Sequence, residues 1–231
     1  MKNYKHLFFD LDRTLWDFEA NSLNTLREIF ENRYLQEKGI KSFDIFLRFY
    51  KTYNHQLWDQ YKAGQIKKAF LSIERFRGTL KNFNINDEEL AYNISQDYIT
   101  ISPTKTKLFP NTKEVLEKLS AKYQLHIITN GFNEVQFDKL KNCGLDVFFH
   151  QIITSEMVGV QKPAAEVFEY ALTKAGAQKT ESVMIGDDQE VDIIGAANFG
   201  IDQIFVNYHK ETLICQPNQE VHELLELLAI L

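Results

Sequence analysis

Carboxylate side chains gather at two places in this 231-residue sequence, each directly after a short apolar run. Asp10 and Asp12 follow the first run, and Asp187, Asp188 and Asp192 follow a later one. Carboxylates that converge on one cleft repel each other strongly unless a cation compensates. A hard divalent ion with oxygen ligands supplies that charge, and magnesium suits a site that also holds a phosphate group. These residues therefore predict a magnesium site for phosphate chemistry.

A hydroxyl group and an ammonium group accompany the carboxylates. Thr129, Asn130 and Gly131 end a third apolar run, and Lys162 stands before Pro163 on a connection. The Thr129 hydroxyl and nearby backbone N–H groups suit an anion, and Lys162 can reach both a nucleophile and a phosphate oxygen. Taken singly, such residues are typical of helix caps, turns and surface loops. Their common placement after strands is what indicates a site.

The apolar runs fit a parallel sheet, because ligands of open parallel sheets bind beyond the carboxyl ends of the strands. After Pro103 strand patterns and helix patterns alternate, which predicts an α/β fold in which helices cover both faces of the sheet. The expected strands are 4–9, 125–129, 152–153, 183–185 and 203–206, and the expected helices are 113–122, 133–142, 164–175, 190–199 and 220–229.

The stretch from about residue 17 to residue 100 has a helical pattern and contains no proline. Three glycines lie near its expected helix ends, namely Gly39, Gly64 and Gly78. Because strand 4–9 must join the same sheet as the later strands, this helical stretch is an insertion after the first strand.

Composition limits the classes of partner. Hydrophobic residues make up 44% of the chain and charged residues 25%, as in an ordinary globular protein. The net charge of −6 argues against a nucleic-acid polymer or an anionic membrane as partner, and no apolar run approaches the roughly 18 residues of a membrane span. Cys143 and Cys215 are too few for a disulfide framework. We expect free thiols, a cytoplasmic location, and a monomer or homodimer that acts on a small phosphorylated metabolite.

Four strings carry a family resemblance. FFDLDRTLW, IITNG, VQKP and IGDDQEVDIIGAANFG occur in that order and resemble the four motifs of the haloacid dehalogenase-like hydrolase superfamily. The resemblance implies a Rossmann-like core domain and an inserted all-helical cap domain that is mobile. The core would comprise residues 1–15 and 101–231, and the cap residues 16–100.

The resemblance also implies a role for each motif residue. Asp10 would be the nucleophile and Asp12 the general acid/base, which protonates the leaving alcohol and then activates water. Thr129 and Lys162 would orient and neutralise the phosphoryl group. Magnesium would be held by Asp10, Asp187 and the backbone carbonyl of Asp12. Dehalogenase members lack a carboxylate at the position of Asp12, so its presence favours phosphatase or phosphotransferase chemistry.

The remaining motif residues have less defined roles. Asn130 and Gly131 are expected beside the phosphate, and Asp192 is expected to support the site from behind and to anchor Lys162. Asp188 stands where Ser or Thr is common, and it is either a ligand through water or a helix cap. Arg13 is expected to be a salt-bridge or rim residue rather than a catalyst.

A narrower resemblance concerns the substrate. IITNGF, CGLDVFF and ITSEMVGVQKPAAEVFEYAL, with LWDQYKAGQI in the cap, resemble the bacterial pyrimidine 5′-nucleotidase subgroup, which dephosphorylates nucleoside monophosphates. The cap is rich in aromatic residues on which a base can stack, although most are expected to pack the helical bundle. Asn54, Trp58 and Tyr61 are the candidates for facing the substrate, and His55 is expected to be structural or solvated.

Three alternatives stay open at this point. One is a sugar-phosphate phosphatase or a phosphoglucomutase-like phosphotransferase with the same cap type. Another is a non-enzymatic phospho-receiver domain, although a receiver is much shorter and carries its acidic pair before a central phosphoacceptor. The last is a non-catalytic binding protein, which would have no chemical need for both Asp10 and Asp12.

Overall fold

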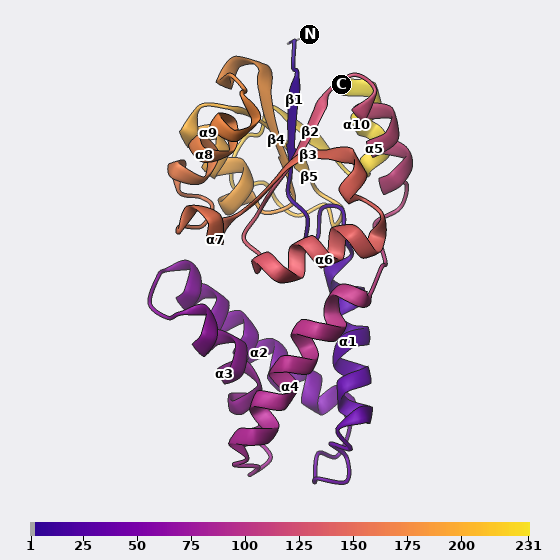
Figure 1. Ribbon diagram of the computed structural model, residues 1–231, viewed down its shortest axis with the longest axis vertical. Helices are drawn as coiled ribbons and strands as arrows, with labels where there is room; N and C mark the ends of the chain where they lie inside the picture. The colour runs from indigo at the N-terminus through magenta and orange to yellow at the C-terminus, as the bar shows by residue number, and fades with distance from the viewer. Residues whose placement is uncertain (1–2) are drawn as a thin grey trace. The chain divides into compact units, whose positions relative to one another are not determined.

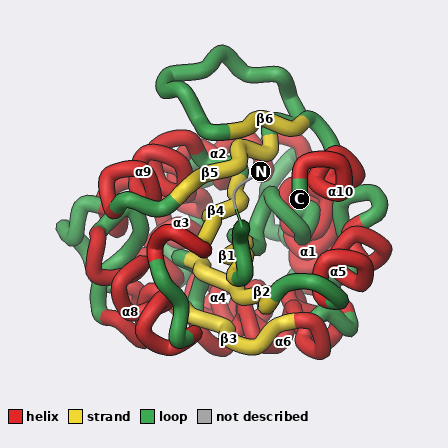
Figure 2. Tube along the Cα trace, turned by 90° about the horizontal axis from the view of Figure 1, so that it is seen from above, coloured by secondary structure: helices red, strands yellow, loops and turns green. Residues whose placement is uncertain are grey.

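Six parallel strands form the sheet of the protein, in the order β3-β2-β1-β4-β5-β6 (Figure 2). The computed structural model describes residues 3–231. Strand β1 (His6–Phe9) pairs with β2 on one side and β4 on the other, so segments far apart in the chain meet at its end. The other strands are β2 (Gln124–Thr129), β3 (Phe149–Thr154), β4 (Ser182–Gly186), β5 (Asp202–Val206) and β6 (Gln219–Val221).

Helices cover both faces of this sheet (Figure 2). Leu7 and Phe9 of β1 point into one hydrophobic cluster and Phe8 into another, as the alternation of side chains along a strand requires. The first cluster lies under α5, α6 and α10, and the second under α8 and α9. This arrangement confirms the predicted α/β class with a Rossmann-like parallel sheet. The helices are α5 (Thr112–Ser120), α6 (Asn133–Cys143), α7 (Ser155–Val158), α8 (Ala165–Ala175), α9 (Gly195–Phe199) and α10 (Leu227–Ile230).

Two helix predictions in this part of the chain need correction. The segment expected as one helix over 190–199 is a π-helical turn, Gln189–Ile194, that continues into α9. The segment expected as helix 220–229 begins with β6 and becomes helical only in its second half. There the edge pairing of β6 prevails over helical periodicity: the Asn207 backbone N–H donates to the Val221 carbonyl at 2.7 Å, and Val221 is buried.

The chain divides into two compact units (Figure 1). The core unit comprises the N-terminal segment up to Glu19 together with Thr106–Leu231, and the helical unit comprises Ala20–Lys105. The junctions fall a few residues further along the chain than expected. Short 3₁₀ turns occur at Ser102–Thr104, Asp146–Phe148, Lys179–Glu181 and Leu224–Glu226.

Aromatic and aliphatic side chains hold the helical unit together, with Phe30, Phe46, Tyr50 and Phe76 among its buried residues. Four helices provide them: α1 (Phe18–Asn32), whose first residues belong to the core unit, α2 (Phe43–Lys62), α3 (Lys68–Lys81) and α4 (Glu88–Ile101). An Arg33–Asp97 ion pair with two hydrogen bonds, of 2.6 and 2.8 Å, connects the residue after α1 to α4. None of the described helices is long and apolar enough to cross a membrane.

Gly78 lies in the last turn of α3, near a helix end as expected, but the helix continues past it to Lys81. A Cβ atom at this position would come within 2.7 Å of the Tyr53 ring on α2. The glycine is therefore explained by close packing of two helices rather than by helix termination.

Candidate active site

Lys162 connects two of the carboxylates that the sequence singled out. Its Nζ atom donates to Asp10 Oδ1 at 2.7 Å, to Asp192 Oδ1 at 2.6 Å and to the Ile128 carbonyl at 2.7 Å. These three hydrogen bonds use every N–H of the ammonium group, and its side chain is only 1% exposed. Asp192 thus anchors Lys162, and Lys162 contacts Asp10, as expected. A direct contact of Lys162 with a phosphate oxygen would require one of these partners to be exchanged.

The ends of β1 and β4 bring three carboxylates into one cluster. Asp10 follows β1, and its backbone N–H donates to the Ile185 carbonyl of β4 at 2.9 Å. Oxygen atoms of Asp10, Asp187 and Asp192 all lie within 4.8 Å of one another. Oxygen ligands at this density suit a hard divalent cation such as magnesium. The donor set therefore fits the predicted metal, with the side chain of Asp192 in the cluster in addition to those of Asp10 and Asp187.

The electrostatics of this cluster also favour a cation. Burial raises the pKa of Asp10 to about 7, against the opposing effect of Lys162. Burial, and then repulsion from Asp10 and Asp192, raises the pKa of Asp187 well above its usual value. Burial alone would lower the pKa of Lys162, but Asp10 and Asp192 outweigh it and raise that pKa. Three crowded carboxylates with one ammonium group leave negative charge that a divalent ion would balance.

Thr14 and Asp188 form hydrogen bonds that fix the acidic loop after β4. The Thr14 hydroxyl donates to Asp187 Oδ1 at 2.8 Å. Asp188 Oδ1 accepts from the backbone N–H groups of Glu190 and Val191 at 3.0 and 2.9 Å, so Asp188 caps the π-helical turn. Of the two roles left open for Asp188, the structure shows the cap. Thr14 was part of the first motif, but the sequence did not indicate its contact with Asp187.

Asp12 points toward α6 instead of joining the cluster. Lys139 Nζ donates to Asp12 Oδ1 at 2.6 Å, and Gln136 Nε2 donates to Asp12 Oδ2 at 3.0 Å. Neither Gln136 nor Lys139 was predicted from the sequence. The signal it offered was weak: two polar residues three positions apart on the helix face that also carries the buried Leu140.

The end of β2 presents a hydroxyl group. Thr129 Oγ1 accepts hydrogen bonds from the Gly131 backbone N–H at 3.1 Å and from Gln136 Nε2 at 2.6 Å. Because these two donors occupy both acceptor positions of the hydroxyl oxygen, its proton is left to be donated. Thr129 lies four residues before α6 begins, so it is a strand-end residue rather than the first residue of the helix.

Asn130 holds the Lys162 loop. Its Nδ2 atom donates to the Lys162 carbonyl at 3.0 Å, and its Oδ1 atom accepts from the Lys162 backbone N–H at 2.9 Å. Both ends of the amide are therefore used to fix the backbone that carries Lys162. Asn130 was expected beside the phosphate; its side chain supports the site from behind.

Arg13 makes the expected salt bridge, to Glu19 at 3.0 Å. Cys143 and Cys215 are free thiols, as predicted.

The candidates in the helical unit have polar and aromatic neighbours within that unit. Asn54 Oδ1 accepts from Tyr50 at 3.4 Å and from Arg75 Nη1 at 3.3 Å. Trp58 and Tyr61 pack edge to face with ring centroids 5.6 Å apart. Arg75, which the sequence analysis did not select, is a buried cation. His55 is 82% exposed and lies 3.5 Å from Asp59, in agreement with a solvated residue.

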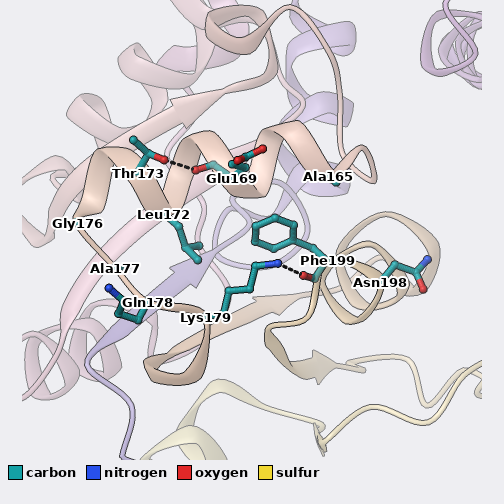
Figure 3. A pocket seen from close by; sticks show the side chains of 10 residues that line it. All are labelled: Ala165, Glu169, Leu172, Thr173, Gly176, Ala177, Gln178, Lys179, Asn198 and Phe199. Carbon is teal, nitrogen blue, oxygen red and sulfur yellow. Dashed lines mark hydrogen bonds between the residues drawn. The ribbon is translucent and has the colours of Figure 1, made fainter.

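A separate hollow is lined by residues of α8, of the loop that follows it and of the C-terminal end of α9 (Figure 3). It has a volume of about 690 Å³ and is open to solvent. Its lining combines small, polar and apolar side chains: Ala165, Glu169, Leu172, Thr173, Gly176, Ala177, Gln178, Lys179, Asn198 and Phe199. None of these residues belongs to the carboxylate cluster, so we place the chemistry at the strand ends.

Known proteins resemble this chain over most of its length. A family model described as haloacid dehalogenase-like hydrolase matches residues 7–206. The pyrimidine 5′-nucleotidase PynA of Streptococcus pneumoniae is 31% identical over 229 residues, which cover 97% of this chain and 94% of PynA. The pyrimidine 5′-nucleotidase YjjG of Escherichia coli is 30% identical over 204 residues, which cover 88% of this chain and 86% of YjjG.

The fold similarity extends over the whole chain. A crystal structure of the HAD-hydrolase YfnB from Bacillus subtilis, described as bound to magnesium and as revealing interdomain movement, matches with a TM-score of 0.88. The two sequences are 29% identical, and the match covers 99% of each chain.

Proposed function

Because the chain belongs to the haloacid dehalogenase-like hydrolase family, we propose that it is a magnesium-dependent phosphatase for nucleoside 5′-monophosphates, pyrimidine nucleotides in particular. The observation that carries the proposal is the position of Asp10. Its carboxylate belongs to the cluster with Asp187 and Asp192 and is hydrogen-bonded to Lys162. A buried carboxylate beside an ammonium group and a cation site is suited to attack an electrophilic phosphorus atom.

The reaction would proceed in two halves. In the first, an Asp10 oxygen attacks phosphorus, the ester P–O bond breaks, and Asp12 supplies the proton that the leaving alkoxide takes up. In the second, Asp12 takes a proton from a water molecule whose oxygen attacks the phosphorus. The bond between phosphorus and Asp10 then breaks, inorganic phosphate leaves, Asp10 is again a carboxylate, and Asp12 is again protonated.

The supporting groups are already in place for such a sequence. Lys162 orients Asp10 and offsets its charge, and the Thr129 hydroxyl has a proton to donate to a phosphoryl oxygen. Asp10, Asp187 and Asp192, with the backbone carbonyl of Asp12, are the groups that would hold magnesium. Bound there, the ion would neutralise charge on the phosphoryl oxygens.

We further propose that the helical unit is a cap that selects the substrate, with Asn54, Trp58 and Tyr61 recognising the base. Aromatic faces accept nucleobases by stacking, and an amide such as that of Asn54 can read base edges. The whole-length similarity to PynA and YjjG supports the choice of pyrimidine nucleotides. The interdomain movement described for YfnB supports a mobile cap.

The test is a measurement of inorganic phosphate release in the presence and absence of magnesium. The panel contains pyrimidine and purine nucleoside 5′-monophosphates, hexose phosphates and a triose phosphate. We expect release from the pyrimidine nucleotides, loss of release on chelation, and recovery when magnesium is restored. Release from the sugar phosphates alone would overturn the nucleotide assignment, and no release from any ester would overturn the phosphatase assignment.

A pair of variants tests the nucleophile. Asp10→Asn should abolish release while the far-UV circular dichroism spectrum and the melting temperature stay close to those of the parent. Asp138→Asn makes the same chemical change at an exposed position on α6 and should keep full activity. Undiminished turnover in Asp10→Asn would refute the covalent mechanism.

A further inference from the structure

Helix α6 directs two polar side chains at the proposed acid/base residue. Gln136 and Lys139 are three positions apart, so both lie on one face of the helix. Lys139 donates to one Asp12 oxygen at 2.6 Å, and Gln136 donates to the other at 3.0 Å. Both oxygens of the carboxylate are thereby held, and each keeps a further lone pair for a proton in transfer.

Burial of the Lys139 ammonium group is unfavourable in free energy unless the group is paired with the Asp12 carboxylate. The residue is 3% exposed, and its Nζ atom lies 4.0 Å from the centre of the Trp16 ring. Among the described residues, Asp12 is the carboxylate with which it forms an ion pair. A buried ammonium group must be paired to be tolerated, and a nonpolar residue would fill the place beside Trp16 more cheaply. The lysine is therefore explained by its bond to Asp12.

Gln136 links Asp12 to the phosphate-binding hydroxyl. Its Nε2 atom donates to Asp12 and also to Thr129 Oγ1, at 2.6 Å. Its Oε1 atom is buried, with no hydrogen-bond partner among the described residues. The reverse orientation of the amide would place Oε1 against the Asp12 carboxylate. In the observed orientation the Gln136 amide nitrogen donates to two acceptors, and the amide oxygen is left without a hydrogen bond among the described residues.

Gly131 makes room for this amide. A Cβ atom at Gly131 would lie 2.4 Å from both Cδ and Nε2 of Gln136. At this distance the Gln136 amide, which is the end of a flexible side chain, would have to shift, so the glycine allows the observed position of Gln136. An exchange at Gly131 can therefore move Gln136 without changing its chemistry.

We propose that Gln136 and Lys139 are positioning residues that present Asp12 as a base in the second half of the reaction, when water attacks the phosphorylated Asp10. This inference rests on the proposed function. The two residues surround Asp12 with hydrogen-bond donors only, which matches the acceptor-only carboxylate that takes a proton from water. Their loss should slow hydrolysis of the phosphoenzyme more than its formation.

The test uses p-nitrophenyl phosphate, whose leaving group departs as an anion and needs little protonation, so that formation of the phosphoenzyme depends least on Asp12. For Lys139→Met we expect kcat to fall about 10- to 100-fold and kcat/KM to fall less than about threefold. KM should then fall as well. A burst of p-nitrophenol close to one equivalent per active site should precede the steady state.

Two further variants probe the same step. Gln136→Met removes the amide donor without a change in charge, and Gly131→Ala displaces the amide; both should lower kcat more than kcat/KM and give a burst. Lys141→Met removes an exposed lysine of the same helix and should match the parent in kcat, KM and burst.

The outcomes separate this inference from the function on which it rests. A partly unfolded variant loses kcat and kcat/KM by the same factor and keeps its KM, so a structural effect cannot imitate the expected pattern. An active parent whose Lys139→Met variant shows equal losses and no burst would overturn the positioning role alone. A parent that releases no phosphate from any ester would overturn both proposals.

Discussion

Protonation of His126 should destabilise the core unit at mildly acidic pH. His126 lies in β2, fully buried, and its Nε2 atom is 3.1 Å from Nδ1 of His6 on β1. The ring of His150 on β3 is tilted by 55° relative to the His126 ring, and the two ring centroids are 6.0 Å apart. Burial, and then the neighbouring His6 and His150, lowers the pKa of His126 to about 3. The folded protein therefore keeps this imidazole neutral at pH values where the unfolded chain protonates it.

The size of the effect follows from linkage. The unfolded chain protonates a histidine near pH 6.5, so the contribution of His126 to stability is fully present above that pH. It falls as the pH decreases toward the folded pKa, because the unfolded state then binds more protons. Between pH 7 and pH 5 the loss is about 2 kcal/mol. Burial also lowers the pKa of His6, which Glu181 opposes and Lys5 reinforces, so His6 adds a change of the same sign.

The assay is denaturant unfolding at pH 7 and pH 5, followed by tryptophan fluorescence. The chain has two tryptophans, and a Trp58→Phe background leaves Trp16, which is buried in the core unit, as the reporter. His126→Leu should be less sensitive to pH than its parent by about 2 kcal/mol across this interval.

The comparison is between pH dependences rather than between absolute stabilities. His126→Leu also breaks the contact with His6, which lowers stability at every pH and cancels in the difference. If parent and His126→Leu lose the same free energy of unfolding between pH 7 and pH 5, the buried neutral imidazole is not what makes the core unit sensitive to acid.

Three further predictions concern packing and metal binding. Gly78→Ala should destabilise the protein by about 1–3 kcal/mol in chemical unfolding, because its Cβ would meet the Tyr53 ring at 2.7 Å; in a Tyr53→Ala background the same exchange should stabilise the helix by up to about 1 kcal/mol. Gly186→Ala should weaken magnesium activation of phosphate release at least about tenfold, since its Cβ would lie 2.2 Å from Asp192 Oδ2; an unchanged magnesium titration would contradict this. Magnesium at about 100 times its Kd should stabilise the parent by about 2.7 kcal/mol in thermal unfolding and should stabilise Asp187→Asn much less; an equal shift in both would remove Asp187 from the metal site.

The strand ends were predictable because two local signals coincide there. Apolar runs marked β1, β2 and β4, and the polar residues directly after them had to meet at one edge of a parallel sheet. Asp10, Thr129 and Asp187 were found in this way without any knowledge of their contacts. The distances confirm the clustering of Asp10 with Asp187 and the contact of Asp10 with Lys162.

Residues whose role depends on partners far away in the sequence could not be predicted from the sequence. Lys139 resembles an ordinary surface lysine until Asp12 and Trp16, more than a hundred positions earlier, are placed beside it. Gly78 resembles a helix terminator until Tyr53 is packed against it. Strand β6 is only three residues long, and its strand character comes from pairing with β5 rather than from its own pattern.

The hydrogen bonds of Lys162 and Thr129 indicate which of the two side chains can contact a phosphate group directly. Lys162 forms an ion pair with Asp10, yet its three N–H groups are engaged by Asp10, Asp192 and the Ile128 carbonyl. The Thr129 hydroxyl oxygen already accepts two hydrogen bonds, so both of its acceptor positions are used. Its O–H group remains able to donate a hydrogen bond. We therefore expect Thr129, rather than Lys162, to make the direct contact with the phosphoryl oxygens, and Lys162 to act through Asp10. On this reasoning Thr129→Val should raise the KM for the phosphate ester, whereas Lys162→Met should chiefly lower kcat; the reverse pattern in steady-state kinetics would contradict it.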